Sequence, residues 1–202
     1  MATATPRTAS RRTQRERSET TIALLVKAAR RLFVEKGYSD TTLDEVATAA
    51  GVTKGAVYHH FSSKRDLFRA VYEREQQSLA EISLAAYRRK RDPKRGFYEA
   101  CRAFFEASLD PGVQRITLID APAALGWDGM REVEDRYSMA LIVNGLRAAI
   151  DDGLIAKRPV EPLAHLIFGA TCEGVMLVAR SEDQRAMSRQ VLAELKNLIG
   201  AF

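Results

Sequence analysis

Residues 43–61 have the pattern of two short helices joined by a tight turn. The small residue Ala47 stands where two steeply crossed helices approach most closely, and Gly51 stands where the turn needs a positive φ angle. The apolar residues of the stretch are placed to form a small core with the preceding helix, and they are Val46, Ala50, Val52 and Val57. The pattern therefore predicts a helix-turn-helix.

The outer face of the second helix carries polar, aromatic or small residues. These residues are Thr53, Lys54, Gly55, Tyr58 and His59. Such a face fits the major groove of DNA, where the first residues of the helix lie nearest the base edges. A helix buried in a bundle would instead carry apolar residues there, and it would have little use for a glycine in its first turn. We therefore predict that this helix reads DNA.

Helical periodicity continues along nearly the whole chain, and we find no convincing alternation of the kind that β-strands show. Upstream, the spacing predicts a helix over residues 19–36 that ends at Gly37. A fourth helix begins after Ser62 or Ser63, and a charged break follows at residues 88–96. Further helices are expected at residues 95–109, 113–120, 127–152, 160–180 and 184–200. The predicted fold is all-α with about nine helices.

The chain divides into three parts by composition and pattern. Residues 1–18 form a flexible basic arm, residues 19–64 form a three-helix DNA-binding domain, and residues 65–202 form a larger helical domain. Five arginines and two glutamates lie in residues 1–20. The arm either adds phosphate or minor-groove contacts or is a solvated tail, and the sequence leaves both interpretations open.

Three segments around the motif resemble the tetracycline-repressor (TetR) family. They are AARRLFVEKGY (28–38), TTLDEVA (41–47) and GVTKGAVYHHFSSKRDLF (51–68). The resemblance covers about residues 21–71, while the remainder matches only in length and helical organisation. It implies a homodimer whose two recognition helices enter successive major grooves of a palindromic double-stranded DNA site. It also implies a C-terminal domain that binds a small-molecule effector, and a repressor that this effector releases.

The same resemblance assigns roles to residues of the motif. Contacts to the DNA backbone are implied for Thr42, Thr53, Tyr58, His60 and Lys64. Contacts to bases are implied for Lys54, Gly55 and His59. Each of these assigned roles has a structural alternative. Tyr58 can serve packing, His60 can fill space beneath Phe61, and Lys64 can be a solvated surface lysine.

Residues 115–127 also resemble one branch of the family, and Asp120, Ala121 and Pro122 are expected to break a helix so that Trp127 starts the next one. An effector pocket needs apolar walls with a few polar groups. The candidate lining residues are Phe104, Phe105, Leu118, Trp127, Tyr137, Leu141, Asn144, Phe168, Cys172, Glu173 and Met176. The alternative for each is plain core, and for Glu173 it is a pairing across a dimer seam.

Two apolar stripes on the last two predicted helices indicate a homodimer. The first comprises Ala164, Phe168, Thr171, Val175 and Val178, and the second comprises Val191, Leu195, Leu198 and Ile199. Together they suggest a four-helix interface, as the resemblance implies. The alternative is that these stripes belong to the internal core of one subunit.

Several functional classes lack their motifs in this sequence. A glycine-rich phosphate loop, a His-x-x-x-His metal pair and a serine nucleophile elbow are all missing, so we predict no enzyme, no catalytic residue, no metal site and no cofactor beyond the effector.

Neither a signal peptide nor an apolar run of about 18 residues is evident, which predicts no membrane association. The two cysteines, Cys101 and Cys172, are expected to be reduced in the cytoplasm. A competing hypothesis is control by a partner protein or by oxidation of these thiols.

Overall fold

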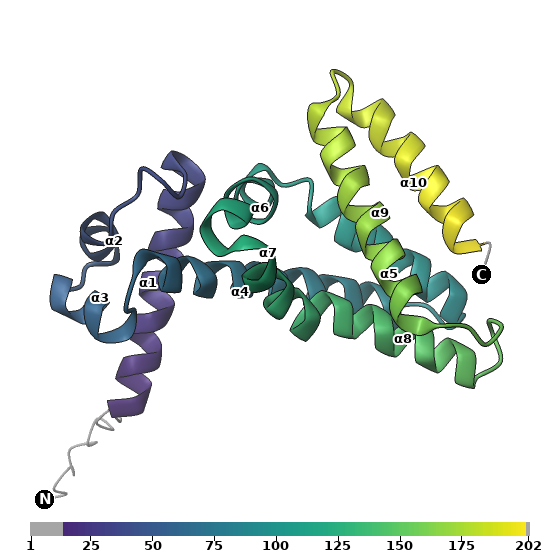
Figure 1. Cartoon of the computed structure of the whole chain (residues 1–202), viewed down its shortest axis with the longest axis horizontal. Helices are drawn as coiled ribbons and strands as arrows, with labels where there is room; N and C mark the ends of the chain where they lie inside the picture. The colour runs from purple at the N-terminus through teal and green to yellow at the C-terminus, as the bar shows by residue number, and fades with distance from the viewer. Residues whose placement is uncertain (1–13, 201–202) are drawn as a thin grey trace, which may run out of the picture.

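The computed structural model describes residues 14–200, and in that range the chain is helical apart from short connections (Figure 1). The α-helices are α1 (Gln14–Lys36), α2 (Leu43–Ala50), α3 (Lys54–His60), α4 (Lys64–Arg88), α5 (Pro93–Ala107), α6 (Pro111–Gln114), α7 (Ala121–Glu134), α8 (Ala140–Asp151), α9 (Val160–Arg180) and α10 (Gln184–Gly200). Two π-helical segments, η1 (Arg115–Asp120) and η2 (Asp135–Met139), join α6 to α7 and α7 to α8. The prediction of an all-α fold is confirmed.

The helical run over residues 111–151 is interrupted at Gly126, where φ is 72° and ψ is 173°. Only glycine adopts this conformation readily. The segments α6, η1 and the start of α7 form one continuous helix before this break, and the rest of α7, η2 and α8 form another after it. Counted in this way, the described residues 14–200 form nine continuous helices, as predicted. The predicted break at Asp120, Ala121 and Pro122 is wrong, because the chain passes from η1 into α7 and Pro122 lies in the first turn of α7, where proline is tolerated. Trp127 nevertheless begins a new continuous helix, directly after the break at Gly126.

The first helix begins at Gln14, five residues before the predicted start at Glu19. Arg15 and Glu19 form an ion pair of 2.9 Å one helical turn apart, and arginine and glutamate both favour helix. Residues 14–18 are therefore helix and not part of a flexible arm. Residues 1–13 of the predicted arm lie outside the described residues.

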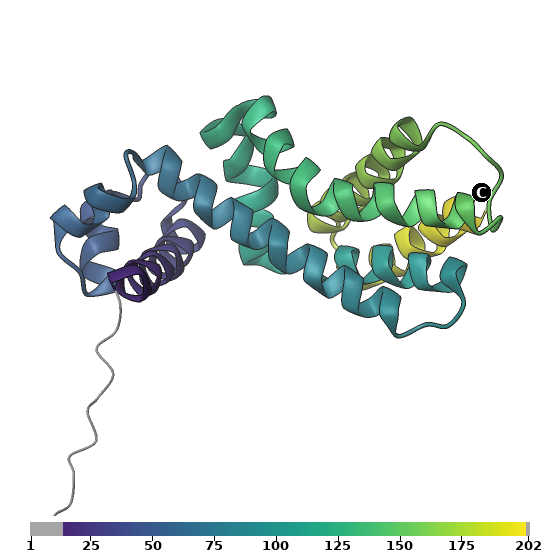
Figure 2. The ribbon, with the colours of Figure 1, turned by 90° about the horizontal axis from the view of Figure 1, so that it is seen from below.

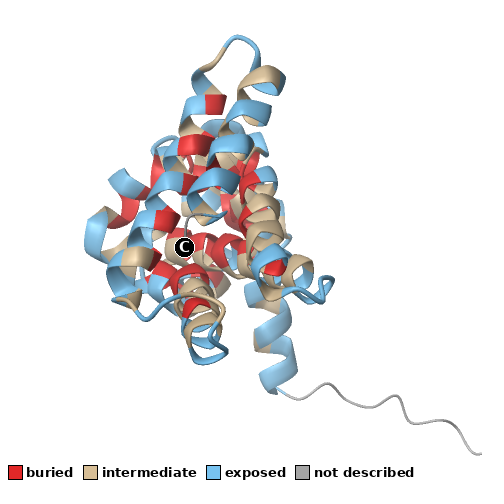
Figure 3. Ribbon diagram, turned by 90° about the vertical axis from the view of Figure 1, so that its right-hand side faces the viewer, coloured by how far each residue is buried: buried red, intermediate tan, exposed pale blue. Residues whose placement is uncertain are grey.

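The three N-terminal helices lie at one end of the molecule, and α4 runs from them into the larger domain (Figures 1 and 2). Buried residues gather on the sides where helices face one another (Figure 3). One buried cluster joins the N-terminal helices to α4, η1 and α7, with Phe33, Phe68 and Ile116 among its members. A second cluster holds α5, α8, α9 and α10 together. The helix-turn-helix is therefore packed directly against part of the larger domain.

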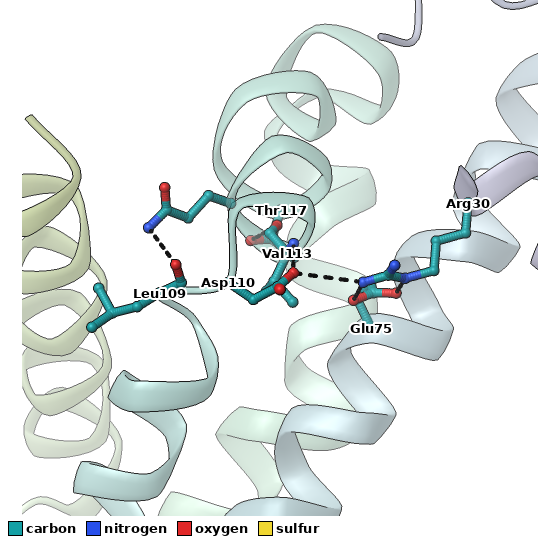
Figure 4. Close-up of polar contacts among 7 residues, drawn as sticks. Arg30, Glu75, Leu109, Asp110, Val113 and Thr117 are labelled. Carbon is teal, nitrogen blue, oxygen red and sulfur yellow. Dashed lines mark hydrogen bonds and ion pairs between the residues drawn. The ribbon is translucent and has the colours of Figure 1, made fainter. Parts of the chain in front are cut away.

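Polar bonds also connect the N-terminal helices to the larger domain. Arg30 on α1 donates to both carboxylate oxygens of the buried Glu75 on α4, at 2.6 and 3.2 Å, and lies 3.9 Å from Asp110 at the start of α6 (Figure 4). The backbone N–H of Tyr38, just after α1, donates to the buried Asp120 of η1 at 3.0 Å. These bonds link α1 and the turn after it to the α6–η1 segment.

The helix α9 is long and apolar enough by composition to cross a membrane, although the sequence predicted no such helix. Seven of its residues are buried in the subunit, and they are Ala164, Ile167, Phe168, Thr171, Gly174, Val175 and Val178. One face of α9 thus packs against the second cluster and neighbouring side chains, which is typical of the core helix of a folded domain.

The predicted dimer stripe on α9 is also wrong, because Ala164, Phe168, Thr171, Val175 and Val178 are the residues that face the subunit core. The opposite face of α9 is exposed and carries Leu166, Gly169, Ala170, Glu173 and Leu177. On α10 the predicted stripe is split, since Leu195 is buried and Leu198 is exposed. Periodicity identifies an apolar face but cannot distinguish packing within a subunit from packing between two subunits.

Candidate nucleic-acid interface

The start of α2 is fixed by reciprocal hydrogen bonds between Thr42 and Glu45. The Glu45 N–H donates to Thr42 Oγ1 at 3.2 Å, and the Thr42 N–H donates to Glu45 Oε2 at 2.9 Å. Lys36, at the end of α1, donates to Glu45 Oε1 at 2.6 Å. The hydrogen bond from Lys36, followed by those from Thr42, lowers the pKa of Glu45 to about 2. Thr42 is thereby held at the exposed start of α2.

The turn between α2 and α3 follows from Gly51 and Thr53. Gly51 ends α2 with φ at 68°, a conformation that strains any residue with a side chain. Thr53 precedes α3 and accepts a hydrogen bond from the Ala56 N–H at 3.2 Å. Val57 is fully buried against the first cluster, so one side of α3 faces the core. The opposite side of α3 is left at the surface.

The exposed side of α3 carries the predicted DNA contacts. Thr53, Lys54, Gly55, Tyr58 and His59 are all exposed, and Tyr58 keeps 51% of its surface accessible. His60 is half-buried, with its ring 4.9 Å from that of His59. The structure therefore brings the recognition-helix residues together on one accessible surface, with His60 at its margin.

Lys54 is paired within the protein. Its Nζ atom donates to Asp44 Oδ2 on α2 at 2.7 Å, and this bond raises the pKa of Lys54. Both side chains are more than half exposed, so water and salt weaken the attraction. The ammonium group can therefore exchange Asp44 for a phosphate or base acceptor at little cost.

Lys64 is not a freely solvated surface lysine. Its Nζ atom donates to the carbonyl oxygens of Tyr38 at 2.8 Å and Ser39 at 2.9 Å, and it lies 4.5 Å from the centre of the Tyr38 ring. These contacts fasten the start of α4 to the turn after α1. An ammonium group has three N–H donors, so one remains for a ligand such as phosphate.

The larger domain contains two neighbouring cavities. The first has a volume of about 250 Å³ between α4, α5, α8 and α9, and the second has about 200 Å³ and extends to α7. Phe104 and Phe168 line both cavities. The predicted lining residues that border at least one cavity are Phe104, Leu118, Trp127, Leu141, Asn144, Phe168 and Cys172.

Four predicted pocket residues border neither cavity. Phe105 is fully buried in a separate cluster with Val175 and Val178, and the Tyr137 hydroxyl donates to Glu73 at 3.0 Å. Glu173 is exposed on the outer face of α9, and Met176 is half-buried. The apolar pattern could not separate cavity walls from solid core, because that distinction depends on how α5, α7 and α9 pack.

The second cavity is also bordered by Ser108, Arg131 and Glu134, which the sequence pattern did not predict. These residues belong to no recognised motif, and they come together only through packing. Glu134 accepts a hydrogen bond from the buried Tyr72 hydroxyl at 2.9 Å. Glu134 is only 8% exposed, and a buried charged residue is unusual enough to mark a candidate site. That burial, however, cannot be recognised from the sequence alone.

The cysteines have little thiolate character at neutral pH. Burial raises the pKa of both Cys101 and Cys172 to about 12. Because the thiolate is the form that is oxidised, these values oppose control by thiol oxidation. The described residues contain no group of three or more side chains suited to a metal ion.

Two family models match the chain. The model "Bacterial regulatory proteins, tetR family" matches residues 25–71, and "Tetracyclin repressor-like, C-terminal domain" matches residues 94–202, just over half of the chain. The chain belongs to the TetR family. The resemblance seen in the helix-turn-helix thus extends to the larger domain.

Individual relatives of this TetR-family protein agree with that assignment. The transposon Tn10 TetC protein of Escherichia coli is 32% identical over 160 residues, which cover 77% of this chain and 79% of that protein. The HTH-type transcriptional regulator SrpR of Pseudomonas putida is 32% identical over 191 residues, which cover 88% and 83%. A crystal structure of a TetR-family regulator from Pectobacterium atrosepticum has a TM-score of 0.75 and 36% identity, and covers 93% of this chain and 95% of that one.

The protein is therefore a DNA-binding transcriptional regulator and not an enzyme. TetR-family regulators generally act as dimers that respond to small molecules. Within this chain the helix-turn-helix provides the DNA-binding surface, and the cavities lie in the C-terminal domain.

Proposed function

We propose that this TetR-family protein is a cytoplasmic repressor that binds a palindromic DNA site as a homodimer and leaves it when a small molecule occupies the C-terminal domain. The observation that carries the DNA-binding part is the exposed face of α3, which is held outward by the buried Val57 and the Gly51 turn. A helix with this exposure and composition fits the major groove.

The side chains around α3 have distinct roles in this proposal. Lys54 and His59 contact base edges, and Gly55 lets the helix backbone approach the DNA closely because it has no side chain. The remaining residues contact the sugar-phosphate backbone, and they are Thr42, Thr53, Tyr58, His60 and Lys64. Backbone contacts add affinity with little sequence preference, whereas base contacts determine the preferred sequence.

The exposed face of α9 and α10 supports the proposed homodimer. Leu166 is 71% exposed, Leu177 47% and Leu198 54%, although large apolar side chains are normally covered when they cluster. Gly169 and Ala170, on the same face of α9, allow a second helix to come close. A twofold axis through this face would present two copies of α3 to successive major grooves.

The packing between the two domains supports release by an effector. Leu118 and Trp127 border the second cavity, and the segment that contains them is bonded to the N-terminal domain through Asp120 and Tyr38. Arg65, in the first turn of α4, also donates to the Leu125 carbonyl at 2.8 Å. A ligand that prefers one arrangement of this segment would therefore shift the position of the DNA-binding domains.

Selection of bound sequences from a random double-stranded DNA pool tests this function. We expect an inverted repeat whose half-site centres lie about 10 base pairs apart or a multiple of that spacing. A parallel selection with the Tyr58→Ala variant, which leaves the buried Val57 in place, should recover the same repeat with weaker enrichment. Recovery of no common sequence, or of a single half-site without symmetry, would contradict the proposal.

A further inference from the structure

Two buried polar atoms in the second cavity have no hydrogen-bond partner among the described residues. They are Ser108 Oγ and Arg131 Nη1, and both residues line the cavity. Ser108 is only 5% exposed, so bulk water does not readily reach its hydroxyl to supply the missing hydrogen bond. A buried polar atom without a partner costs free energy, which a ligand can recover by bonding to it.

Neighbouring polar groups of the cavity are already engaged. Gln76 donates to the Tyr72 hydroxyl at 3.2 Å, and Thr117 donates to the Val113 carbonyl at 2.9 Å. Glu134 accepts from the same Tyr72 hydroxyl. Ser108 and Arg131 therefore supply the free hydrogen-bonding capacity that points to a ligand.

The charges around Arg131 indicate whether the ligand group is ionised. Arg131 Nη1 lies 3.3 Å from Glu134 Oε2, so a carboxylate already balances the guanidinium charge. A second carboxylate at this position would repel Glu134 and would also lose its hydration. An uncharged oxygen accepts a hydrogen bond from Arg131 without that repulsion.

The aromatic walls indicate what the rest of the ligand is. Phe104 and Phe168 line both cavities, and their rings are in edge contact with centroids 5.9 Å apart, so they form an apolar wall that the two cavities share. Three hydroxyls of the first cavity are engaged within the chain, and they belong to Ser83, Ser138 and Thr171. That cavity therefore presents mainly hydrocarbon and aromatic surface, which suits an apolar group.

We propose that the second cavity binds the oxygen atom of an uncharged, mostly apolar ligand, such as an alcohol, phenol or ketone. Ser108 and Arg131 bind that oxygen, and the hydrocarbon part packs against the rings of Phe104 and Phe168. This inference rests on the proposed effector response, and it specifies the chemical class of the effector.

Isothermal titration calorimetry with 1-octanol and with sodium octanoate tests this site, because the two probes differ only in the head group. The wild-type protein should bind 1-octanol at least ~10-fold more tightly than octanoate. Ser108→Ala should weaken octanol binding by about threefold to tenfold, since one hydrogen bond is lost. The same variant should melt at a higher temperature without ligand, because it removes an uncompensated buried hydroxyl.

Thr117→Val is the matched control, since it removes a hydroxyl from the same cavity that is already paired. It should leave octanol affinity within about twofold, because no ligand bond is lost. Equal or tighter binding of octanoate, unchanged octanol affinity in Ser108→Ala, or no binding of either probe would overturn the inference.

Fluorescence anisotropy of the selected DNA, measured with and without 1-octanol, separates this inference from the proposed function. Octanol binding that depends on Ser108 but does not release DNA would contradict the effector response, while it would still support the ligand site. Release of DNA by octanoate, equally in wild type and Ser108→Ala, would support the effector response and overturn the ligand class.

Discussion

Two glycines four residues apart in the helix-turn-helix have different physical roles. Gly51 has a φ of 68° and open space around it. Glycine is therefore needed there for its backbone conformation and not because a side chain would clash. Gly55 lies inside α3 at the surface, also with open space around the position of a Cβ atom, so helix geometry does not require glycine there. Its small size matters only if another molecule approaches.

Alanine at the two positions should therefore have opposite effects. Gly51→Ala should lower the free energy of unfolding by about 1–2 kcal/mol through backbone strain. Gly55→Ala should raise it by about 0.5–1 kcal/mol while weakening DNA binding, since alanine favours helix and its methyl group faces the DNA. Urea unfolding and DNA-binding anisotropy measure the two quantities. Unchanged DNA affinity in Gly55→Ala would argue against close approach of α3.

The low pKa of Glu45 predicts how pH affects the start of α2. The pKa falls from the ordinary 4.5 to about 2 in the folded protein, so the stabilisation is present above about pH 4.5 and is lost as pH falls toward 2. Glu45→Gln should melt at a lower temperature than wild type at pH 7. The difference should shrink between pH 4.5 and pH 2, as thermal scans can show, and a difference that is constant with pH would contradict this account.

Residues whose roles are local could be predicted from sequence. Thr42, Gly51 and Thr53 cap or end helices through contacts within a few residues, and the structure confirms the positive φ predicted at Gly51. Ser108 and Arg131 could not be predicted in the same way. Their lack of partners depends on how α5, α7 and α9 pack, and no short pattern records that packing.

At the scale of helices, Lys64 joins α4 to the turn after α1. Lys64→Met should lower the free energy of unfolding by about 1–2 kcal/mol, because the carbonyls of Tyr38 and Ser39 lose a charged donor. If the third N–H contacts phosphate, the slope of log affinity against log salt should also fall by about 1. Lys157→Met, at an exposed lysine between α8 and α9, is the control. A stability loss with an unchanged salt slope would contradict the phosphate contact.

Helix positions were predicted better than helix partners. The predicted bounds 160–180 and 184–200 coincide with α9 and α10, because Pro159 and the polar residues between the helices mark the ends clearly. The π-helical segments η1 and η2 were not predicted, since their wider turns leave no distinct periodicity. The dimer stripe on α9 was assigned to the wrong face because both faces of that helix carry apolar residues.

At the scale of the whole molecule, the outer face of α9 is where two subunits should meet. Leu166→Lys should shift the protein from dimer to monomer and reduce DNA affinity at least ~10-fold, because a charge would be buried and paired half-sites could no longer be bound together. Ile119→Lys, at a residue of η1 that is 57% exposed, is the control. Sedimentation velocity gives the assembly state, and an unchanged dimer in Leu166→Lys would place the interface elsewhere.

The most direct test of the account is the affinity of wild type and Lys54→Met for the selected DNA site and for each of its single-base-pair variants. If α3 reads bases in the major groove, Lys54→Met should lose about 1–3 kcal/mol of discrimination at one base pair in each half-site and keep it elsewhere. An equal loss of affinity for every variant, or no loss at all, would contradict base reading by α3.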